Sequence, residues 1–232
     1  MVTKSPKRNT RARSDDDKGL RRSHILSVAL ELWRETDYAS VTMSGVAARA
    51  DLAKGTLYLY FQTKEELFLA LLGDLLGHWF ESVQAQLERA TATNLAELLT
   101  RSLESSEDMV RLLSILSTVL ESNASQAAVL EFKTRLALQS ALVGEALERI
   151  LGLEPGGGTR LLLLFNALTI GLYQMSRPVA GVSDAPHLKN LSVNFALELR
   201  SALEALIRGF SSSDLRPQTS DDRHQTPDKT AW

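Results

Sequence analysis

The sequence predicts an all-helical protein, and three observations support this fold class. Apolar residues recur at three- and four-residue spacing between the two ends of the 232-residue chain, and no segment alternates as a half-buried strand would. Good helix caps precede several of these segments, and glycine or proline breaks separate them. We expect about nine helices, arranged as a small amino-terminal three-helix unit followed by a larger helical body.

The first four helices are the best marked. The first, at about Lys18–Thr36, repeats apolar residues four positions apart, at Ile25, Ala29 and Trp33. Thr42 is a good N-cap for a short second helix, Met43–Ala50. The turn Asp51-Leu52-Ala53 leads to a third helix at about Lys54–Phe61. The string Thr63-Lys64-Glu65-Glu66 is a capping box, so a fourth helix begins there and continues to about Ala90.

Five more helices complete the body. They are expected at Asn94–Glu104, Glu107–Ser122, Gln126–Leu151, Thr159–Ser176 and His187–Phe210. Breaks fall at residues 123–125, at 155–158 and at 177–186. The glycines at 156–158 are interpreted as a flexible turn.

Both ends of the chain are polar, and the charge is unevenly distributed. Residues 1–18 are predicted to be a disordered basic arm, and residues 211–232 a disordered tail. Residues 1–64 carry 12 Lys/Arg against 7 Asp/Glu, whereas the remainder carries 14 against 21. A basic first quarter on an acidic body suits a protein that binds a polyanion at one end.

Several classes of protein are disfavoured. The absence of cysteine excludes disulfides, thiolate metal sites and a cysteine nucleophile. The four histidines have no metal-ligand spacing, and neither a nucleophile elbow nor a phosphate-binding loop is present. The amino terminus lacks the apolar core of a signal peptide. The uncharged stretch between Arg160 and Arg177 is 16 residues long. Its helical length of about 24 Å is short of a membrane span.

The third helix has an outer face that suits DNA. With Leu57 placed at 0°, Phe61 falls at about 40°, so both point into the small core, while Leu59 falls at about 200°. A leucine opposite the core, flanked by Thr56, Tyr58 and Tyr60, is a poor solvent face and a good groove-facing one. Threonine can hydrogen-bond to bases or phosphates, leucine can contact thymine methyl groups, and Tyr58, Tyr60 and Lys64 can hold the backbone. The alternative is that the tyrosines only pack at a helix junction; the capped helix, tight turn and capping box around them favour DNA.

These residues resemble the amino-terminal domain of the TetR/AcrR family of bacterial transcription regulators. The resemblance covers residues 19–79, with a helix-turn-helix at about 42–61, and rests on Thr42, Val46-Ala47, the run from Lys54 to Tyr58, Tyr60-Phe61, Lys64 and Glu66-Leu67. It implies a cytoplasmic, nucleoid-associated homodimeric repressor that leaves a palindromic operator when a small molecule binds. By position, the family's common DNA contacts fall on Thr42, Lys54, Gly55, Thr56, Tyr58, Tyr60 and Lys64. Leu59 replaces a frequent aromatic residue, and Ser44 stands where a longer side chain sometimes reads bases.

The resemblance assigns residues 80–210 to effector binding and dimerisation. Two leucine-rich sets suit a four-helix bundle between subunits or, equally, an ordinary core: Leu161, Leu164, Leu168 and Leu172, and Leu188, Leu191, Phe195, Leu199 and Leu203. Asn166, Tyr173 and Gln174 interrupt apolar runs and are candidate effector-binding groups, although backbone or water can also satisfy buried amides. Because the body is mainly apolar, we expect a largely apolar effector.

We therefore expect a DNA-binding regulator without a cofactor or metal. An enzyme and a constitutive DNA-architectural protein are the alternatives. Release from a specific site by an effector distinguishes the first from both.

Overall fold

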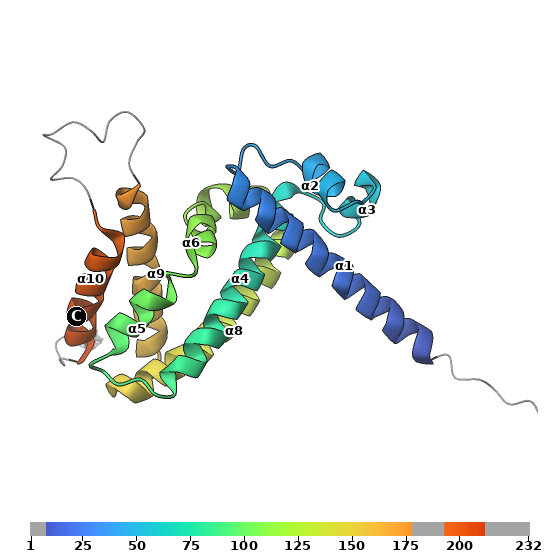
Figure 1. Cartoon of the computed structure of the whole chain (residues 1–232). Helices are drawn as coiled ribbons and strands as arrows, with labels where there is room; N and C mark the ends of the chain where they lie inside the picture. The colour runs from blue at the N-terminus through green and yellow to red at the C-terminus, as the bar shows by residue number, and fades with distance from the viewer. Residues whose placement is uncertain (1–7, 178–192, 212–232) are drawn as a thin grey trace, which may run out of the picture.

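A computed structural model describes residues 8–177 and 193–211, with the side chains of residues 17–177 and 193–210. All of its regular structure is helical within these ranges, as the sequence predicted. The helices are α1 (Arg8–Glu35), α2 (Met43–Arg49), α3 (Lys54–Tyr58), α4 (Lys64–Leu87), α5 (Leu95–Ser102), α6 (Glu107–Leu113), the π-turn η1 (Leu116–Leu120), α7 (Glu121–Asn123), α8 (Gln126–Leu151), α9 (Gly157–Ser176) and α10 (Phe195–Ser211). In Figure 1, α2 and α3 lie beside α1 at one end of the molecule, α4 and α8 form its long axis, and α5, α9 and α10 lie at the other end.

The first helix is longer than expected. It begins at Arg8, so the predictions of a helix start at Lys18 and of disorder in residues 8–18 are wrong; residues 1–7 lie outside the described ranges. The sequence places opposite charges four residues apart, as in Arg11 and Asp15 or Arg13 and Asp17, and such pairs stabilise a helix without tertiary packing. Figure 1 shows this part of α1 projecting away from the rest of the chain.

Short helices and irregular turns replace the single helix expected at Glu107–Ser122. The segment bends after α6, passes through η1 and ends in α7. Serine hydroxyls bind main-chain carbonyls here: Ser114 Oγ donates to Arg111 O (2.7 Å) and Ser122 Oγ donates to Ser117 O (2.8 Å). Such side-chain bonds compete with the helical ladder.

The last helix also starts later than expected. Val193 and Asn194 are not helical, and Asn194 Oδ1 accepts a hydrogen bond from Leu197 N (3.1 Å) at the start of α10. Residues 187–192 of the expected helix lie outside the described ranges, as does the predicted tail beyond Ser211.

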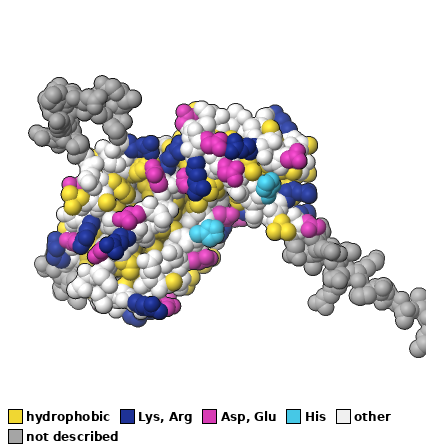
Figure 2. All heavy atoms as spheres, in the orientation of Figure 1, with side chains coloured by type: hydrophobic (Ala, Val, Ile, Leu, Met, Phe, Trp, Pro, Cys, Tyr) yellow, Lys and Arg dark blue, Asp and Glu magenta, His cyan; other side chains and the backbone are white. Residues whose placement is uncertain are grey.

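A single apolar core continues from α1 to α10, and α4 lies at its centre. At the α1 end, Ile25, Ala29 and Trp33 pack with Val46 and Leu57, all of them buried. Half of the 24 residues of α4 are buried, because α4 contacts α1 on one side and α8 on another. In the face of the molecule drawn in Figure 2, the surface over this core carries charged side chains of both signs.

Glycines let the long helices approach closely. A Cβ added at Gly77 of α4 would lie 2.8 Å from the Arg135 guanidinium of α8, so Arg135 lies against the backbone of α4. A Cβ at Gly158 of α9 would lie 2.0 Å from the carbonyl oxygen of Gly144 in α8. Only hydrogen fits at the contact between Gly158 and Gly144, so the backbones of α8 and α9 touch there. α4 also packs along α8, and the three helices form one block.

The glycine-rich connection is consequently not a flexible turn, and that interpretation was wrong. Gly156 has a φ of +88°, and Glu148 Oε1 accepts hydrogen bonds from Gly156 N (2.8 Å) and Gly158 N (3.2 Å). A carboxylate at this position satisfies free N–H groups at the start of α9 and complements its dipole. The connection is thus a capped helix start.

Substituting Gly158 tests this packing. Gly158→Ala should lower the free energy of unfolding by about 2–3 kcal/mol or more, because the methyl group must displace the backbone of α8. Gly19→Ala is the matched control, since nothing lies within 4 Å of a Cβ there. It should stabilise α1 by about 0.5–1 kcal/mol. Equal denaturant midpoints for the two variants would contradict the close contact of α8 with α9.

Candidate nucleic-acid interface

Two short helices joined by a tight turn form the candidate interface. Thr42 Oγ1 accepts a hydrogen bond from Gly45 N (3.0 Å), which confirms the predicted N-cap of α2. In the turn, Asp51 adopts a left-handed φ of +53°, and Leu52 N donates to Ala47 O (2.9 Å). Aspartate tolerates this backbone region better than most residues with a side chain. The turn therefore brings α3 back across the end of α2.

The outer face of α3 agrees with the helical-wheel prediction. Leu57 is fully buried, whereas Leu59 is 84% exposed and Tyr58 is 41% exposed. α3 itself ends at Tyr58, three residues earlier than expected, and Leu59 and Tyr60 continue as a turn in which Tyr60 N and Phe61 N both donate to Leu57 O (3.0 and 3.1 Å). The turn keeps Leu59 on the surface.

Most of the other predicted contact residues surround Leu59. Lys54 and Gly55 are exposed at the start of α3, Thr56 is half-buried beside them, and the Lys54 ammonium lies 5.9 Å from the Tyr58 ring centroid. Nothing lies within 4 Å of a Cβ built at Gly55, so this backbone is open to a close approach. Thr42 is exposed at the start of α2, and Tyr60 is half-buried toward α1. The exposed end of α3 thus carries a cation, a hydroxyl, an aromatic ring and an apolar tip.

Lys64 does not point outward with this group. Its ammonium donates to Tyr38 O (2.8 Å) and lies 4.0 Å from the centroid of the Tyr38 ring. The Tyr38 hydroxyl donates to Glu65 Oε1 (2.7 Å), and burial together with this carboxylate raises the pKa of Tyr38 far above its ordinary value. Tyr38 stays neutral at physiological pH. Lys64 therefore fastens the loop between α1 and α2 onto α4.

The sequence did not reveal that α6 holds the end of α1. Arg111 donates to Trp33 O (2.7 Å) and Thr36 O (2.6 Å), and its guanidinium stacks 3.8 Å from the Trp33 ring centroid. A cation favours the carboxyl end of a helix, where carbonyls lack partners. Arg34 and Asp108 add an ion pair of 2.7 Å between the same helices. Opposite charges were visible in the sequence, but a separation of more than 70 residues hid their pairing.

The three predicted effector-binding residues differ in burial. Asn166 and Gln174 are exposed, so the premise that they are buried amides was wrong, and Gln174 Nε2 donates to Ser114 O (3.3 Å). Tyr173 is buried, but its hydroxyl accepts a hydrogen bond from Arg177. In contrast, Thr169 is 2% exposed, and its hydroxyl has no hydrogen-bond partner among the described residues.

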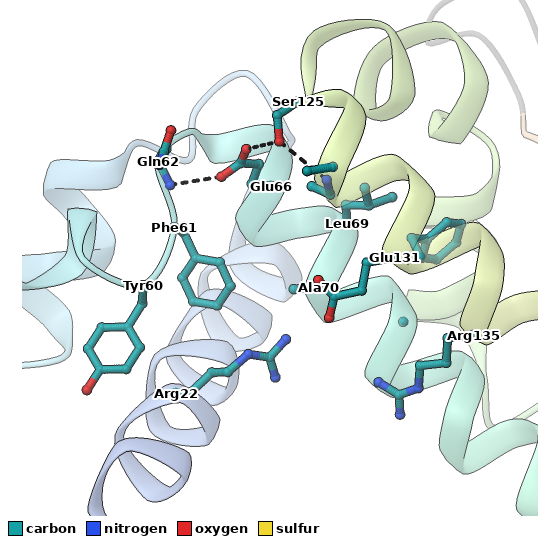
Figure 3. Close-up of a pocket in the computed structure, with 14 residues that line it drawn as sticks. Arg22, Tyr60, Phe61, Gln62, Glu66, Leu69, Ala70, Ser125, Glu131 and Arg135 are labelled. Atoms are coloured by element: carbon teal, nitrogen blue, oxygen red, sulfur yellow. Dashed lines mark hydrogen bonds between the residues drawn. The ribbon is translucent and has the colours of Figure 1, made fainter. Parts of the chain in front are cut away.

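Grooves border α4 at several places along its length. The first, of about 340 Å³, separates α1 and the turn after α3 from α8, and is drawn in Figure 3. The second, of about 330 Å³, lies where α4, α5 and α6 meet, with Trp79 and Met109 among its lining residues. No cluster of three or more His, Asp or Glu side chains suited to a metal occurs in the described part of the chain. Likewise, no helix within residues 8–177 and 193–211 has the length and apolarity needed to cross a membrane.

A capped helix-turn-helix on a larger helical body is the architecture of a DNA-binding regulator, and comparison with known proteins gives the family. Residues 25–71 match the model of bacterial regulatory proteins of the tetR family, and residues 74–214 match that of the tetracyclin repressor-like C-terminal domain. The second match alone covers more than half of the chain. The protein belongs to the TetR family.

Individual relatives are similar over part of the chain. The repressor KstR of Mycolicibacterium smegmatis is 41% identical over 70 residues, which is 30% of this chain and 32% of KstR. The fatty acid metabolism regulator protein of Bacillus subtilis is 35% identical over 69 residues, which is 29% of this chain and 36% of that protein. The chain therefore matches about a third of the length of these curated relatives.

Solved structures extend the likeness of fold to both parts of the chain. The structure of Thermus thermophilus FadR in complex with lauroyl-CoA has a TM-score of 0.55 and 20% identity, and the match covers 81% of this chain and 93% of FadR. The FadR–stearoyl-CoA structure from Bacillus subtilis has a TM-score of 0.53 and 17% identity, and its match covers 80% of this chain and 96% of that one.

The two lysines near α3 should behave differently when removed. Lys64→Ala should lower the free energy of unfolding by about 1–3 kcal/mol, because a charged hydrogen bond and a cation–π contact are lost. Lys54→Ala should leave stability nearly unchanged and reduce the salt slope of DNA binding by about 0.9. Thermal unfolding and binding titrations at several salt concentrations measure both effects. A reduced slope with unchanged stability in Lys64→Ala would make Lys64 a phosphate contact instead.

Proposed function

We propose that this protein is a homodimeric repressor that binds a palindromic operator through α2 and α3 and is released by a small, largely apolar molecule. The observation that carries the proposal is the 84% exposed Leu59 at the tip of α3, beside Tyr58, Thr56 and Lys54. The exposed Leu59 side chain adds nothing to the core, whereas it can contact base edges in the major groove of DNA. As a regulator of bacterial DNA, the protein would work in the cytoplasm, associated with the nucleoid when bound, without a catalytic role.

We expect two kinds of DNA contact. Leu59, directly after α3, and the half-buried Thr56 would meet base edges. Lys54, Tyr58, Tyr60 and Thr42 would contact the sugar-phosphate backbone, and the open backbone at Gly55 permits close approach. Lys64 contributes by holding the α1–α2 loop. The +5 balance of residues 1–64 favours this end of the chain for DNA.

Residues 19–79 would supply DNA binding, and residues 80–210 dimerisation and effector binding. One recognition helix covers few base pairs, so a second copy is needed to read a palindrome. On α9, Leu163 and Met175 are each 65% exposed, and on α10 Leu197 is 63% exposed. We expect these exposed residues to face the partner subunit. In contrast, Leu161, Leu199 and Leu203 are fully buried within the subunit and belong to its own core, and Leu188 and Leu191 lie outside the described ranges.

The body favours an apolar effector. Trp79 stacks on Phe165 with ring centroids 6.1 Å apart, and Met109 is buried in the same core cluster. A strongly charged ligand would be desolvated there without compensation. The unpartnered hydroxyl of Thr169 is available to one polar atom of a ligand. The acyl-CoA ligands named for the FadR structures are reasonable first compounds to test, because an acyl chain is apolar and can be buried while the charged CoA group stays in solvent.

The primary experiment is selection of the operator from random DNA, followed by substitution of Leu59. Leu59→Ala should leave the melting temperature nearly unchanged, because the side chain is exposed. It should cost about 1 kcal/mol or more on the selected DNA and little on random DNA, where phosphate contacts dominate. Equal losses on both DNAs, or a large drop in melting temperature, would show that Leu59 packs instead of reading bases.

Dimerisation can be tested on the exposed face of α9. Leu163→Asp should produce helical monomers, because the charge lies on the surface of the subunit but inside the proposed interface. Leu199→Asp, the buried control, should instead unfold the chain. Sedimentation and circular dichroism separate the two outcomes. If the Leu163→Asp variant formed stable dimers, the interface would not include Leu163.

Effector release can be tested on the selected operator. Acyl-CoAs and other apolar or amphipathic compounds should include ligands that lower DNA affinity, because only a ligand that prefers the unbound conformation can shift the equilibrium. Fluorescence anisotropy of labelled DNA measures the shift. Release by a metal ion or an inorganic polyanion, with no response to this panel, would contradict an apolar effector.

A further inference from the structure

Two carboxylates on α4 join the DNA-binding end of the chain to α8. Glu66 Oε2 accepts a hydrogen bond from Gln62 N (3.0 Å), in the turn that follows α3, and Glu66 Oε1 accepts one from Ser125 Oγ (2.6 Å), the N-cap of α8. Asp74 lies two turns further along α4. It pairs with Arg22 of α1 (3.6 Å) and with Arg135 of α8 (3.0 Å).

The two links lie at the borders of the groove drawn in Figure 3. Dashed lines at one edge of the groove mark the hydrogen bonds that join Glu66 to Gln62 and Ser125. Toward the other edge lie Arg22 and Arg135. The groove of about 340 Å³ separates Phe61 on the DNA-binding side from Glu131 on α8. Direct side-chain packing is therefore incomplete at this junction, so polar links carry part of the contact between the turn and α8.

The link through Glu66 is specific in its chemistry. A carboxylate accepts at both oxygens, so Glu66 binds the turn and Ser125 at once. Ser125 Oγ also accepts from Ala128 N (3.3 Å), and this bond continues the connection into the first turn of α8. Hydrogen bonds to an ionised group are stronger and shorter than neutral ones. The start of α8 is thereby connected to the backbone at Gln62, directly after the turn that holds Leu59 and Tyr60.

We propose that Glu66 is a positioning residue for DNA recognition, which ties the turn after α3 to the N-cap of α8 and so lets a movement of α8 reorient the recognition surface. The inference rests on the proposed function, since it concerns how that surface is set. Asp74, Arg22 and Arg135 hold the far end of the junction. Breaking the Glu66–Ser125 bond should then tilt the DNA-binding helices and not detach them.

Substitutions at Ser125 distinguish its role as the N-cap of α8 from its hydrogen bond to Glu66. Aspartate and asparagine both cap helices well, so α8 should keep its N-cap in either variant. The Ser125→Asn amide can donate to Glu66, whereas the Ser125→Asp carboxylate repels it. In the double variant Glu66→Gln with Ser125→Asp, the glutamine amide can donate to the new carboxylate and its oxygen can still accept from Gln62 N, so the link is restored.

Two measurements report on the hydrogen bonds that join Gln62, Glu66 and Ser125. Deuterium exchange of the Gln62 amide reports the turn without DNA, and anisotropy with the selected operator reports recognition. Ser125→Asp should accelerate the exchange and weaken operator binding by about tenfold, the size expected when a hydrogen bond to a charged group is lost. Ser125→Asn and the double variant should stay near the wild type in both. Ser122→Asp is the charge control, because Ser122 lies near the start of α8 and its hydroxyl binds Ser117 O instead of Glu66.

Each outcome decides the proposal. It fails if Ser125→Asp and Ser125→Asn exchange alike, if the double variant does not restore the wild-type values, or if exchange changes while operator affinity does not. Equal effects of Ser122→Asp and Ser125→Asp would also refute it, because general charge would then be responsible. If the wild type selects no DNA, the proposed repressor function has failed, and the exchange measurements alone decide whether the link exists.

Discussion

The burial of α4 is the constraint on which the rest of the structure depends. This helix is packed by α1 on one side and by α8 on another, and half of its residues are buried. Because α4 begins beside the recognition turn and ends within the body, neither part can be repacked without disturbing it. Trp33, Phe68 and Tyr38 form edge-to-face contacts at its first turns, with centroids 5.1 to 5.6 Å apart, which fix its start against α1 and the following loop. The same helix is therefore part of both the DNA-binding end and the body.

The sequence predicted best what depends on neighbouring residues. The orientation of Leu57 and Leu59 follows from helical geometry alone, and the Thr42 and Thr63 caps bind backbone N–H groups three residues away, at 3.0 and 3.1 Å. The contacts that the sequence did not predict link distant segments. Ser125 and Glu66 are 59 residues apart, and Arg111 and Trp33 are 78 apart. Local pattern carries no information on such pairs. Lys64 is a similar case, because its spacing predicts a phosphate contact but does not reveal its contacts with Tyr38.

The burial of individual side chains also could not be predicted from the local sequence pattern. Asn166 and Gln174 interrupt apolar runs, yet they lie on the exposed side of α9, while Thr169 on the same helix is buried. The period of a helix shows which residues share a face, but only the neighbouring helices decide which face is covered. The glycines near position 156 illustrate this point too. They looked like a flexible connection because the contact that requires glycine at position 158, with the backbone of Gly144 in another helix, is not part of the local sequence.

The two types of contact have different consequences for regulation. Where α8 meets α9, Gly144 and Gly158 bring the two backbones together, and even a methyl group does not fit; a block that contains such a contact resists gradual deformation. At the junction with α1 and the recognition turn, a groove remains, and hydrogen bonds and ion pairs from Glu66, Asp74, Arg111 and Arg34 supplement the apolar packing of α1 on α4. Such bonds can be exchanged for water at a small net cost when both partners are released. A ligand that shifts the block as a unit would therefore produce its largest structural change at this junction, where the recognition surface is attached.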